Sequence, residues 1–276
     1  MLTDVLIPLR THPTPDSPDT TQKLLRLAST FATHATISPL EVVVPPVRHR
    51  WSSAFVGVGS ASAEIERKSR EASKALQAIA EQSHGLQVVA QPLRVPFGDP
   101  ASSLTLAAHC HDVTMVGFSD AELSAAMAEA AMFGTGRPVL LVPADVPETV
   151  RPFAKIALAW DGSSSASRAL FDAMPLITKA DEVIVINAPD DKPIENNDTS
   201  GLTAYLIRHG VAPRFVEANT DVLGIGLALQ QTAKTEGAGL LIMGAYGHSR
   251  LQQFILGGAT RQVLESLQLP VLMSHS

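Results

Sequence analysis

The stretch that decides the fold is LLIMGAYGHSRLQQFILGGATRQVL, residues 240–264. Its first five residues form a continuous apolar run, as in a strand that is buried on both faces. Glycines follow at positions 244, 247, 257 and 258, and glycine lets a backbone turn sharply or approach a ligand closely. A strand, a glycine-rich loop and a helix in this order predict an open parallel α/β sheet, in which ligands bind beyond the carboxyl ends of the strands.

Outward from this stretch, short apolar runs alternate with segments of helical period along all 276 residues. Three local matches relate the two halves: VLIPL (5–9) parallels IALAW (156–160), VTMVG (113–117) parallels LLIMG (240–244), and RPVLLVP (137–143) parallels LPVLMSH (269–275). We therefore predict an α/β protein of two tandem, doubly wound, Rossmann-like domains with five-stranded, mainly parallel sheets. The domains are 1–147 and 148–276, joined through the polar, proline-containing stretch 144–153.

Each half is expected to run strand, helix, strand, helix, strand, helix, strand, helix, strand. The strands are predicted at 5–9, 41–44, 86–93, 113–117 and 138–142, and at 155–160, 182–187, 212–217, 240–244 and 270–274. The helices are predicted at 20–33, 63–82, 100–109 and 122–131, and at 164–177, 200–209, 222–236 and 258–267. Residues 45–62, rich in Arg, His, Ser and Gly, are expected to form an inserted loop.

Composition narrows the class of protein. A net charge of -6 argues against a nucleic-acid binder, which needs a concentrated basic face. A single cysteine excludes an internal disulfide, and no apolar run approaches the roughly 20 residues that span a bilayer. The opening MLTDVLIPLR lacks the basic start and long apolar core of a secretory signal. We therefore expect a cytoplasmic protein with no membrane or nucleic-acid partner.

Asp161 directly follows the first strand of the second repeat, in AWDGSSSASRAL. A carboxylate there could accept hydrogen bonds from an adenosine, while Ser163 or Ser164 caps the next helix. The alternative is that Asp161 only takes part in the turn.

Gly257 and Gly258 precede a helix that begins near Ala259 and Thr260. The unpaired N–H groups and positive dipole end of such a helix form an anion site. Thr260 would add a hydroxyl, and His248 or Arg250 a positive charge. Spacing alone leaves open whether the glycines serve only the turns.

The spacing of Gly244, Gly247, Gly257 and Gly258 resembles the nucleotide motif of the universal stress proteins, and Asp161 matches an aspartate of that family. The resemblance covers the second repeat in full and the first at the level of the fold, and it implies an adenine nucleotide α-hydrolase-like fold. Many nucleotide-binding members have serine where Gly258 stands, so one hydroxyl is missing here. The residues that the resemblance implies around the nucleotide are Ala159, Trp160, Asp161, Ala188, Met243, Gly244, Gly247, His248, Gly257, Gly258, Ala259 and Thr260.

The first repeat differs at the same places. Arg10 occupies the position of Asp161, and Pro138 comes 21 positions after Gly117, whereas Pro270 comes 26 positions after Gly244. Acidic Asp120 and Glu122 stand where phosphates would need cations or bare N–H groups. We predict one nucleotide per chain.

Other signals are weaker. The glycine-rich pieces at 57–62 and 224–229 lack the strand–turn–helix context of a dinucleotide loop, and no Walker phosphate loop occurs. His109, Cys110 and His111 lack a second ligand pair at suitable spacing, so no metal site of the protein's own is predicted. No residues form a recognisable catalytic arrangement.

The resulting hypothesis is a binding module that holds ATP, ADP or AMP in its second repeat, with Mg²⁺ bridging phosphates. The resemblance implies a role in survival under stress. It also implies that the fifth strands, 138–142 and 270–274, pair as an intrachain pseudo-dimer, with a homodimer as a further association and an unnamed regulatory protein as partner. Two alternatives stay open: an ATP-consuming enzyme or slow ATPase of the same structural class, and a nucleotide-free scaffold.

Overall fold

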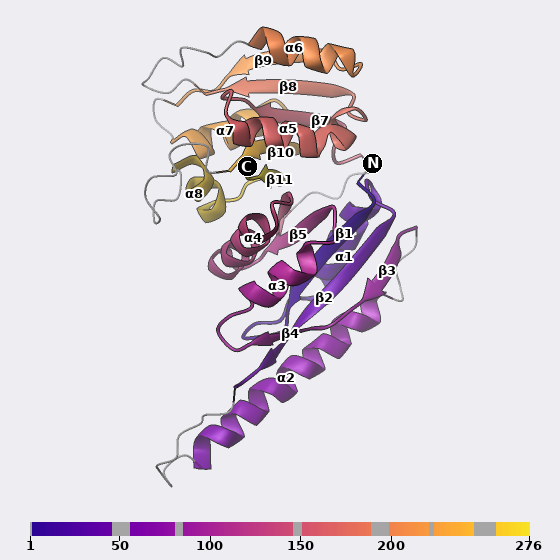
Figure 1. The fold of residues 1–276 in the computed structure, drawn as a ribbon, viewed down its shortest axis with the longest axis vertical. Coiled ribbons are helices and arrows are strands. Elements are labelled where there is room, and N and C mark those ends of the chain that lie inside the picture. Colours follow the sequence, from indigo (N-terminus) through magenta and orange to yellow (C-terminus); the bar gives the residue numbers. More distant parts are fainter. Residues whose placement is uncertain are drawn as a thin grey trace.

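The structure is a computed structural model that describes residues 2–45, 56–80, 85–145, 151–188, 199–220, 224–245 and 258–276. Figure 1 shows the two halves of the chain one above the other, each with strands and covering helices. The expected α/β class is confirmed.

The first half alternates strands with helices from the N-terminus. Its elements are β1 (Asp4–Arg10), α1 (Pro18–Ser29), β2 (His34–Val43), α2 (Val56–Ala80), β3 (Gln87–Ala90), β4 (Leu93–Pro96), α3 (Ala101–Ala108), β5 (Val113–Phe118), α4 (Ala121–Thr135) and β6 (Val139–Pro143).

The second half repeats the same alternation. Its elements are β7 (Lys155–Ala159), α5 (Ser164–Ile177), β8 (Glu182–Asn187), α6 (Thr199–Arg208), β9 (Pro213–Glu217), α7 (Ile225–Thr235), β10 (Leu240–Gly244), α8 (Gly258–Glu265) and β11 (Val271–Ser274).

All these strands belong to one sheet, in the order β3-β2-β1-β5-β6-β11-β10-β7-β8-β9, with β4 also paired to β2. Within each half the neighbours are parallel, and the order reverses once, between β1 and β5 and between β7 and β10. The halves join where β6 runs antiparallel to β11, with Leu140 opposite Leu272. The predicted pairing of the fifth strands is thereby confirmed.

The strands are buried on both faces because helices cover both. In β1, Val5, Ile7 and Leu9 belong to the core under α1, α2, α5 and α6. Leu6 points the other way, into the core under α3, α4, α7 and α8. Both cores run through both halves, and this explains why the strands read as continuous apolar runs in the sequence.

Two first-half predictions need correction. The strand expected at 86–93 is split into β3 and β4, because Pro92 has no N–H to offer the ladder. Both pieces lie along β2, which begins at His34 and so is much longer than the predicted 41–44. Ser38 and Pro39 of β2 lie opposite the gap between the two pieces, and this proline hid the first half of the strand in the sequence.

The inserted loop predicted at 45–62 is wrong in part, since residues 56–62 are helical and 46–55 lie outside the described residues. Helix α2 is anchored on β2 by two side chains: Ser69 Oγ accepts the Val42 N–H at 2.8 Å, and Glu66 Oε1 accepts the Val44 N–H at 2.9 Å. Once nucleated, a helix gains one hydrogen bond per added residue, which carries it through Gly57 and Gly59.

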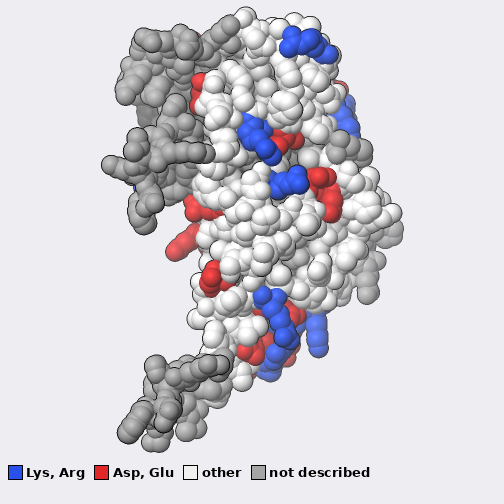
Figure 2. Space-filling view, viewed as in Figure 1, with Lys and Arg blue, Asp and Glu red and all other residues white. Residues whose placement is uncertain are grey.

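Figure 2 shows acidic and basic side chains next to one another on the face drawn, with broad uncharged areas between them. On α2, Arg67 pairs with both Glu64 and Glu71 at 2.6 Å. These hydrogen bonds lower the pKa of Glu64 and raise that of Arg67. Of the helices in the described ranges, none is both long and apolar enough to cross a membrane.

Candidate functional site

The two points where strand order reverses are the places where this architecture binds ligands. In the second half this point lies between β7 and β10, which pair in parallel from Leu240–Ile156 to Ile242–Leu158. Asp161 follows β7 after one residue, and Gly244 ends β10, so both lie at the carboxyl edge of the sheet.

A tight turn links Asp161 to α5. Asp161 Oδ1 accepts the Ser163 N–H at 2.9 Å, and Gly162 between them has a φ of 73°, a conformation that favours glycine. Ser163 is the N-cap of α5, because its Oγ accepts the Ala166 N–H at 3.1 Å. Capping by Ser163 is thus confirmed, and Asp161 does take part in the turn. An ionised carboxylate accepts about four hydrogen bonds, so this bond alone does not exhaust its capacity.

Gly244 brings β10 against the first turn of α5. A Cβ at this position would lie 2.5 Å from the Ala166 nitrogen and 2.8 Å from Ser165 Oγ. These distances are far inside van der Waals contact, and the nitrogen belongs to backbone that cannot rotate away. Only glycine fits here, so the sequence motif has a packing reason at this position.

Three predicted residues begin α8. Gly258 is exposed, and a Cβ there would meet nothing within 4 Å. Ala259 is half-buried and Thr260 is only 2% exposed. The structure therefore leaves open space at the first residue of the helix and buries the threonine that was expected to offer its hydroxyl to a phosphate.

The remaining predicted residues fall into two groups. Ala159 and Met243 are buried with their side chains in the core under α7 and α8, which leaves their backbone as the part that a ligand could contact. Trp160 and Ala188 are half-buried and pack against the two cores. Gly247, His248, Arg250 and Gly257 lie outside the described residues.

Two polar atoms at this edge were not singled out from the sequence. Asn187 Oδ1, at the end of β8 beside Ala188, and Ser274 Oγ, opposite Gly244 at the end of β11, are buried without a hydrogen-bond partner among the described residues. Buried polar atoms are normally paired, so each marks a place where a ligand donor would be accommodated. Neither carried a sequence signal, since both simply end apolar strands.

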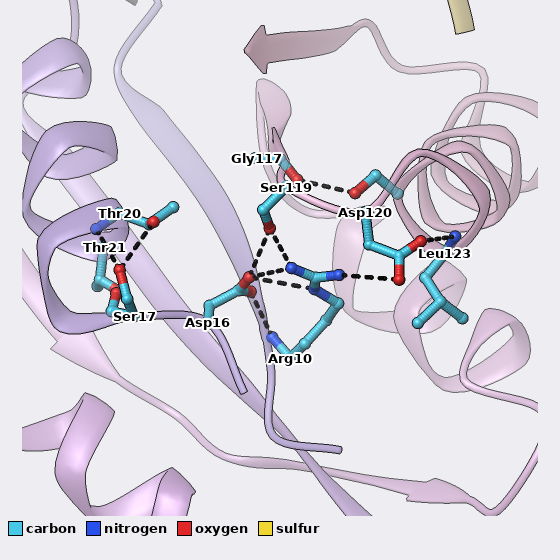
Figure 3. Close-up of polar contacts among 10 residues, drawn as sticks. Arg10, Asp16, Ser17, Thr20, Thr21, Gly117, Ser119, Asp120 and Leu123 are labelled. Carbon is cyan, nitrogen blue, oxygen red and sulfur yellow. Dashed lines mark hydrogen bonds and ion pairs between the residues drawn. The ribbon is translucent and has the colours of Figure 1, made fainter. Parts of the chain in front are cut away.

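The first half places a buried ion pair at its own reversal point, as Figure 3 shows. Arg10, the last residue of β1, contacts Asp16 Oδ1 at 2.5 Å, and the two side chains are only 7% and 8% exposed. Ser119, after β5, accepts a hydrogen bond from the same guanidinium group. Asp120 Oδ2 lies 3.9 Å from Arg10 Nη1. The sequence had marked Arg10 and Asp120 but gave no indication of Asp16 or Ser119.

The first half also has no room in its chain for a long loop after β5. Helix α4 begins at Ala121, three residues after β5 ends, and Asp120 caps it by accepting the Leu123 N–H at 3.2 Å. The protein's own carboxylate therefore occupies the helix N-terminus where a bound anion would otherwise lie.

The histidine–cysteine cluster lies between α3 and β5, as expected. His111 Nδ1 contacts Asp4 at 2.9 Å, and His109 ends α3 with Nδ1 2.8 Å from the Thr105 carbonyl. Within the described ranges, no group of three or more His, Cys, Asp or Glu side chains could hold a metal ion.

The fold defines a doubly wound α/β protein, and the candidate site lies at the carboxyl edge of its second half. Comparison with known proteins gives the family. Residues 152–275 match the model described as "Universal stress protein family", and the second half of the chain belongs to that family.

Solved structures extend the likeness in fold to the first half. A universal stress protein from Archaeoglobus fulgidus is 16% identical with a TM-score of 0.67, over 98% of this chain and 96% of that one. A Pseudomonas aeruginosa protein is also 16% identical with a TM-score of 0.53, over 99% of this chain and 93% of that one. No curated protein matches the chain.

Proposed function

We propose that this chain is a binding module that holds one adenine nucleotide in its second repeat. The observation that carries the proposal is the close approach of Gly244 to the first turn of α5, at the reversal point of a segment that matches the family model. The proposed contacts are Ala159, Trp160, Asp161, Ala188, Met243, Gly244, Gly247, His248, Gly257, Gly258, Ala259 and Thr260.

The described residues fit such a ligand. The Asp161 turn would face the nucleoside, and the open space at Gly258 would admit a phosphate to the N–H groups of α8. The ligand would be ATP, ADP or AMP, and Mg²⁺ would neutralise its phosphates from solution.

The first repeat would bind no nucleotide. The Arg10–Asp16 ion pair fills its reversal point, and the Asp120 carboxylate would repel a phosphate from the N-terminus of α4. Moving either charge out of this arrangement would leave its partner buried and uncompensated, which is unfavourable.

The cellular role would be in the stress response, in the cytoplasm. Nucleotide occupancy would then govern an encounter with a partner protein or with a second copy of the chain. The sequence contains no recognisable catalytic arrangement for activating water, and the proposal is therefore a binder and not an efficient ATPase.

The test is a census of bound ligand by mass spectrometry on full-length protein purified without added nucleotide, followed by calorimetric titration with ATP, ADP and AMP. We expect a stoichiometry of one per chain, and Asp161→Ala should weaken binding at least tenfold, because a hydrogen bond to a charged group contributes about 1.5–3 kcal/mol.

Asp181→Ala is the matched control, since that carboxylate is exposed and bonded to Arg151 at the opposite edge of the second repeat. The affinity of Asp181→Ala for adenine nucleotides should equal that of the wild type. A stoichiometry of two equivalent sites would contradict the assignment to one repeat. Sustained turnover at several per minute would favour the enzyme, and absence of any adenine nucleotide binding would favour the scaffold.

A further inference from the structure

The antiparallel seam between β6 and β11 brings one end of the first repeat to the site in the second. Because the strands run in opposite directions, Val139 at the start of β6 pairs with Met273 near the end of β11. The end of α4, which leads into β6, must therefore lie at the carboxyl edge of β11. This is the edge of the second repeat where Asp161 and Gly244 lie.

His275, just after β11, connects the two repeats at this edge. Its Nδ1 donates to the Ala245 carbonyl oxygen, 3.2 Å away, and its ring packs edge-on against Phe133 of α4, with centroids 4.8 Å apart and planes 74° apart. Ala245 follows β10 and is itself held by its N–H, which donates to the Ser274 carbonyl at 2.8 Å. Phe133 of the first repeat thus supports, through His275, the residue that follows the glycine-containing strand β10.

A second contact reaches the other side of the site. Arg168, in the second turn of α5, donates from its guanidinium to the Gly136 carbonyl at 3.2 Å. Gly136 is the left-handed C-cap of α4, only three residues beyond Phe133. One helix end of the first repeat therefore contacts both α5, which follows the Asp161 turn, and His275, which bonds to the residue after β10.

The related contact on the first repeat has different residues. Counted from the matched fifth strands, Glu265 corresponds to Phe133 and Pro143 to His275. Glu265 is bonded to Arg261 on its own helix at 2.6 Å, and proline has neither an aromatic ring nor an N–H to donate. The aromatic contact is therefore built only toward the edge of the second repeat.

From these contacts we infer that Phe133 is a positioning residue for the nucleotide site, although it lies in the repeat that binds no nucleotide. It acts through His275, which holds the Ala245 carbonyl and so fixes the end of β10 relative to α5. The expected effect of Phe133 on nucleotide affinity rests on the proposed function, whereas its structural role at Ala245 rests on the contacts described above. It gives the first repeat a role that two independent copies would lack.

The experiment compares Phe133→Leu with wild type in the full chain, because leucine keeps an apolar side chain but removes the ring edge. The dissociation constant of ATP, measured by calorimetry with Mg²⁺ present, should rise about two- to tenfold, the size of one aromatic pair. Phe133→Tyr keeps the ring and should restore wild-type affinity. His275→Ala should have an equal or larger effect, and the double variant should be no worse than His275→Ala alone, because both substitutions break the same connection.

Phe97→Leu is the matched control. Phe97 is 50% exposed against 45% for Phe133, and it also packs on a histidine, His12, at 5.7 Å. Both residues of this pair belong to the first repeat, and so loss of the Phe97 ring should leave the affinity for ATP unchanged.

A second measurement needs no nucleotide. Hydrogen exchange of the Ala245 amide should be faster in Phe133→Leu, while amides of the β6–β11 ladder keep wild-type protection. If wild-type protein binds no adenine nucleotide, the proposed function fails, but the exchange result still decides whether Phe133 holds Ala245. Unchanged exchange at Ala245, or an equal rise along β6 and β11, would overturn the inference, as would an equal effect of Phe97→Leu.

Discussion

Substituting Gly244 by alanine is the most direct test of the packing on which the site is built. The new Cβ would lie 2.5 Å from both the Ala166 nitrogen and the Ser165 carbonyl carbon, about 1 Å closer than van der Waals contact. Overpacking of this kind costs about 1–3 kcal/mol. Removing a glycine from the unfolded chain returns about 0.4–1 kcal/mol. We therefore expect a net loss of about 1–2 kcal/mol in the free energy of unfolding.

Gly117 provides the control, because it stands in β5 at the position that Gly244 occupies in β10 when VTMVG (113–117) is matched with LLIMG (240–244). A Cβ at Gly117 would lie 3.3 Å from Leu24 Cδ1, the far end of a flexible side chain. The same substitution there should change the free energy of unfolding by less than about 1 kcal/mol, in either direction.

Urea denaturation of the full chain, followed by circular dichroism and tryptophan fluorescence, measures both variants. Nucleotide titration should separate them as well, because moving α5 moves the turn that carries Asp161, and small displacements of binding groups are costly. We expect at least a tenfold weaker affinity for Gly244→Ala and wild-type affinity for Gly117→Ala. Equal stability and equal affinity in the two variants would refute the argument that close packing of β10 on α5 shapes the site.

Four further predictions follow from described contacts. Arg10→Met should lower the free energy of unfolding by about 3–5 kcal/mol, because it leaves the buried Asp16 carboxylate without its counter-charge, and adding Asp16→Leu should recover much of this in thermal denaturation. Gly258→Ser meets no atom, so it should keep the wild-type melting temperature and tighten phosphate-dependent binding, seen as a larger gain for ATP than for adenosine. Ser163→Ala should cost about 1 kcal/mol through the lost N-cap bond, measured by urea denaturation, while Ser163→Asp should retain it. Hydrogen bonds from Lys155, and to a smaller extent from Arg214, lower the pKa of Glu182 in the folded protein. The stabilisation that Glu182 contributes is therefore complete above the pKa of this group in the unfolded chain, and it is lost as pH falls through its pKa in the folded protein. Below pH 4.5, Glu182→Gln should lose less thermal stability on acidification than wild type does.

Much of the fold could be predicted because the same signals occur twice. The opening, fourth and fifth strands of the halves resemble one another in sequence, and this predicted the repeat. The pairing of β6 with β11 was predicted from the resemblance to the universal stress proteins. Ser163 was predictable as an N-cap because capping is local and depends on a few neighbouring residues.

The remaining features of the fold and of the candidate site depend on contacts between residues far apart in the chain, which short sequence patterns do not indicate. The sequence predicted the second half of β2 but not the first, because Pro39 indicates the end of a strand. The structure shows that Pro39 lies opposite the gap between β3 and β4, where the strand pairing is interrupted. Ser119 is 109 residues from Arg10, and Phe133 is far from His275 in the chain, so neither pairing can be read from spacing. The sequence shows that Arg10 stands where the second repeat has Asp161, but it does not show that Arg10 pairs with Asp16.

The internal seam also decides how far this sheet can grow. A protein with one such repeat has an exposed fifth strand, onto which a second copy can add, whereas here that edge is consumed within the chain. The sheet ends at β3 on one side and β9 on the other. Pro92 and Pro96 interrupt the donors along the first margin, and Arg214 and Glu217 place charge on the second. Both margins therefore discourage a further copy from adding a strand to this sheet.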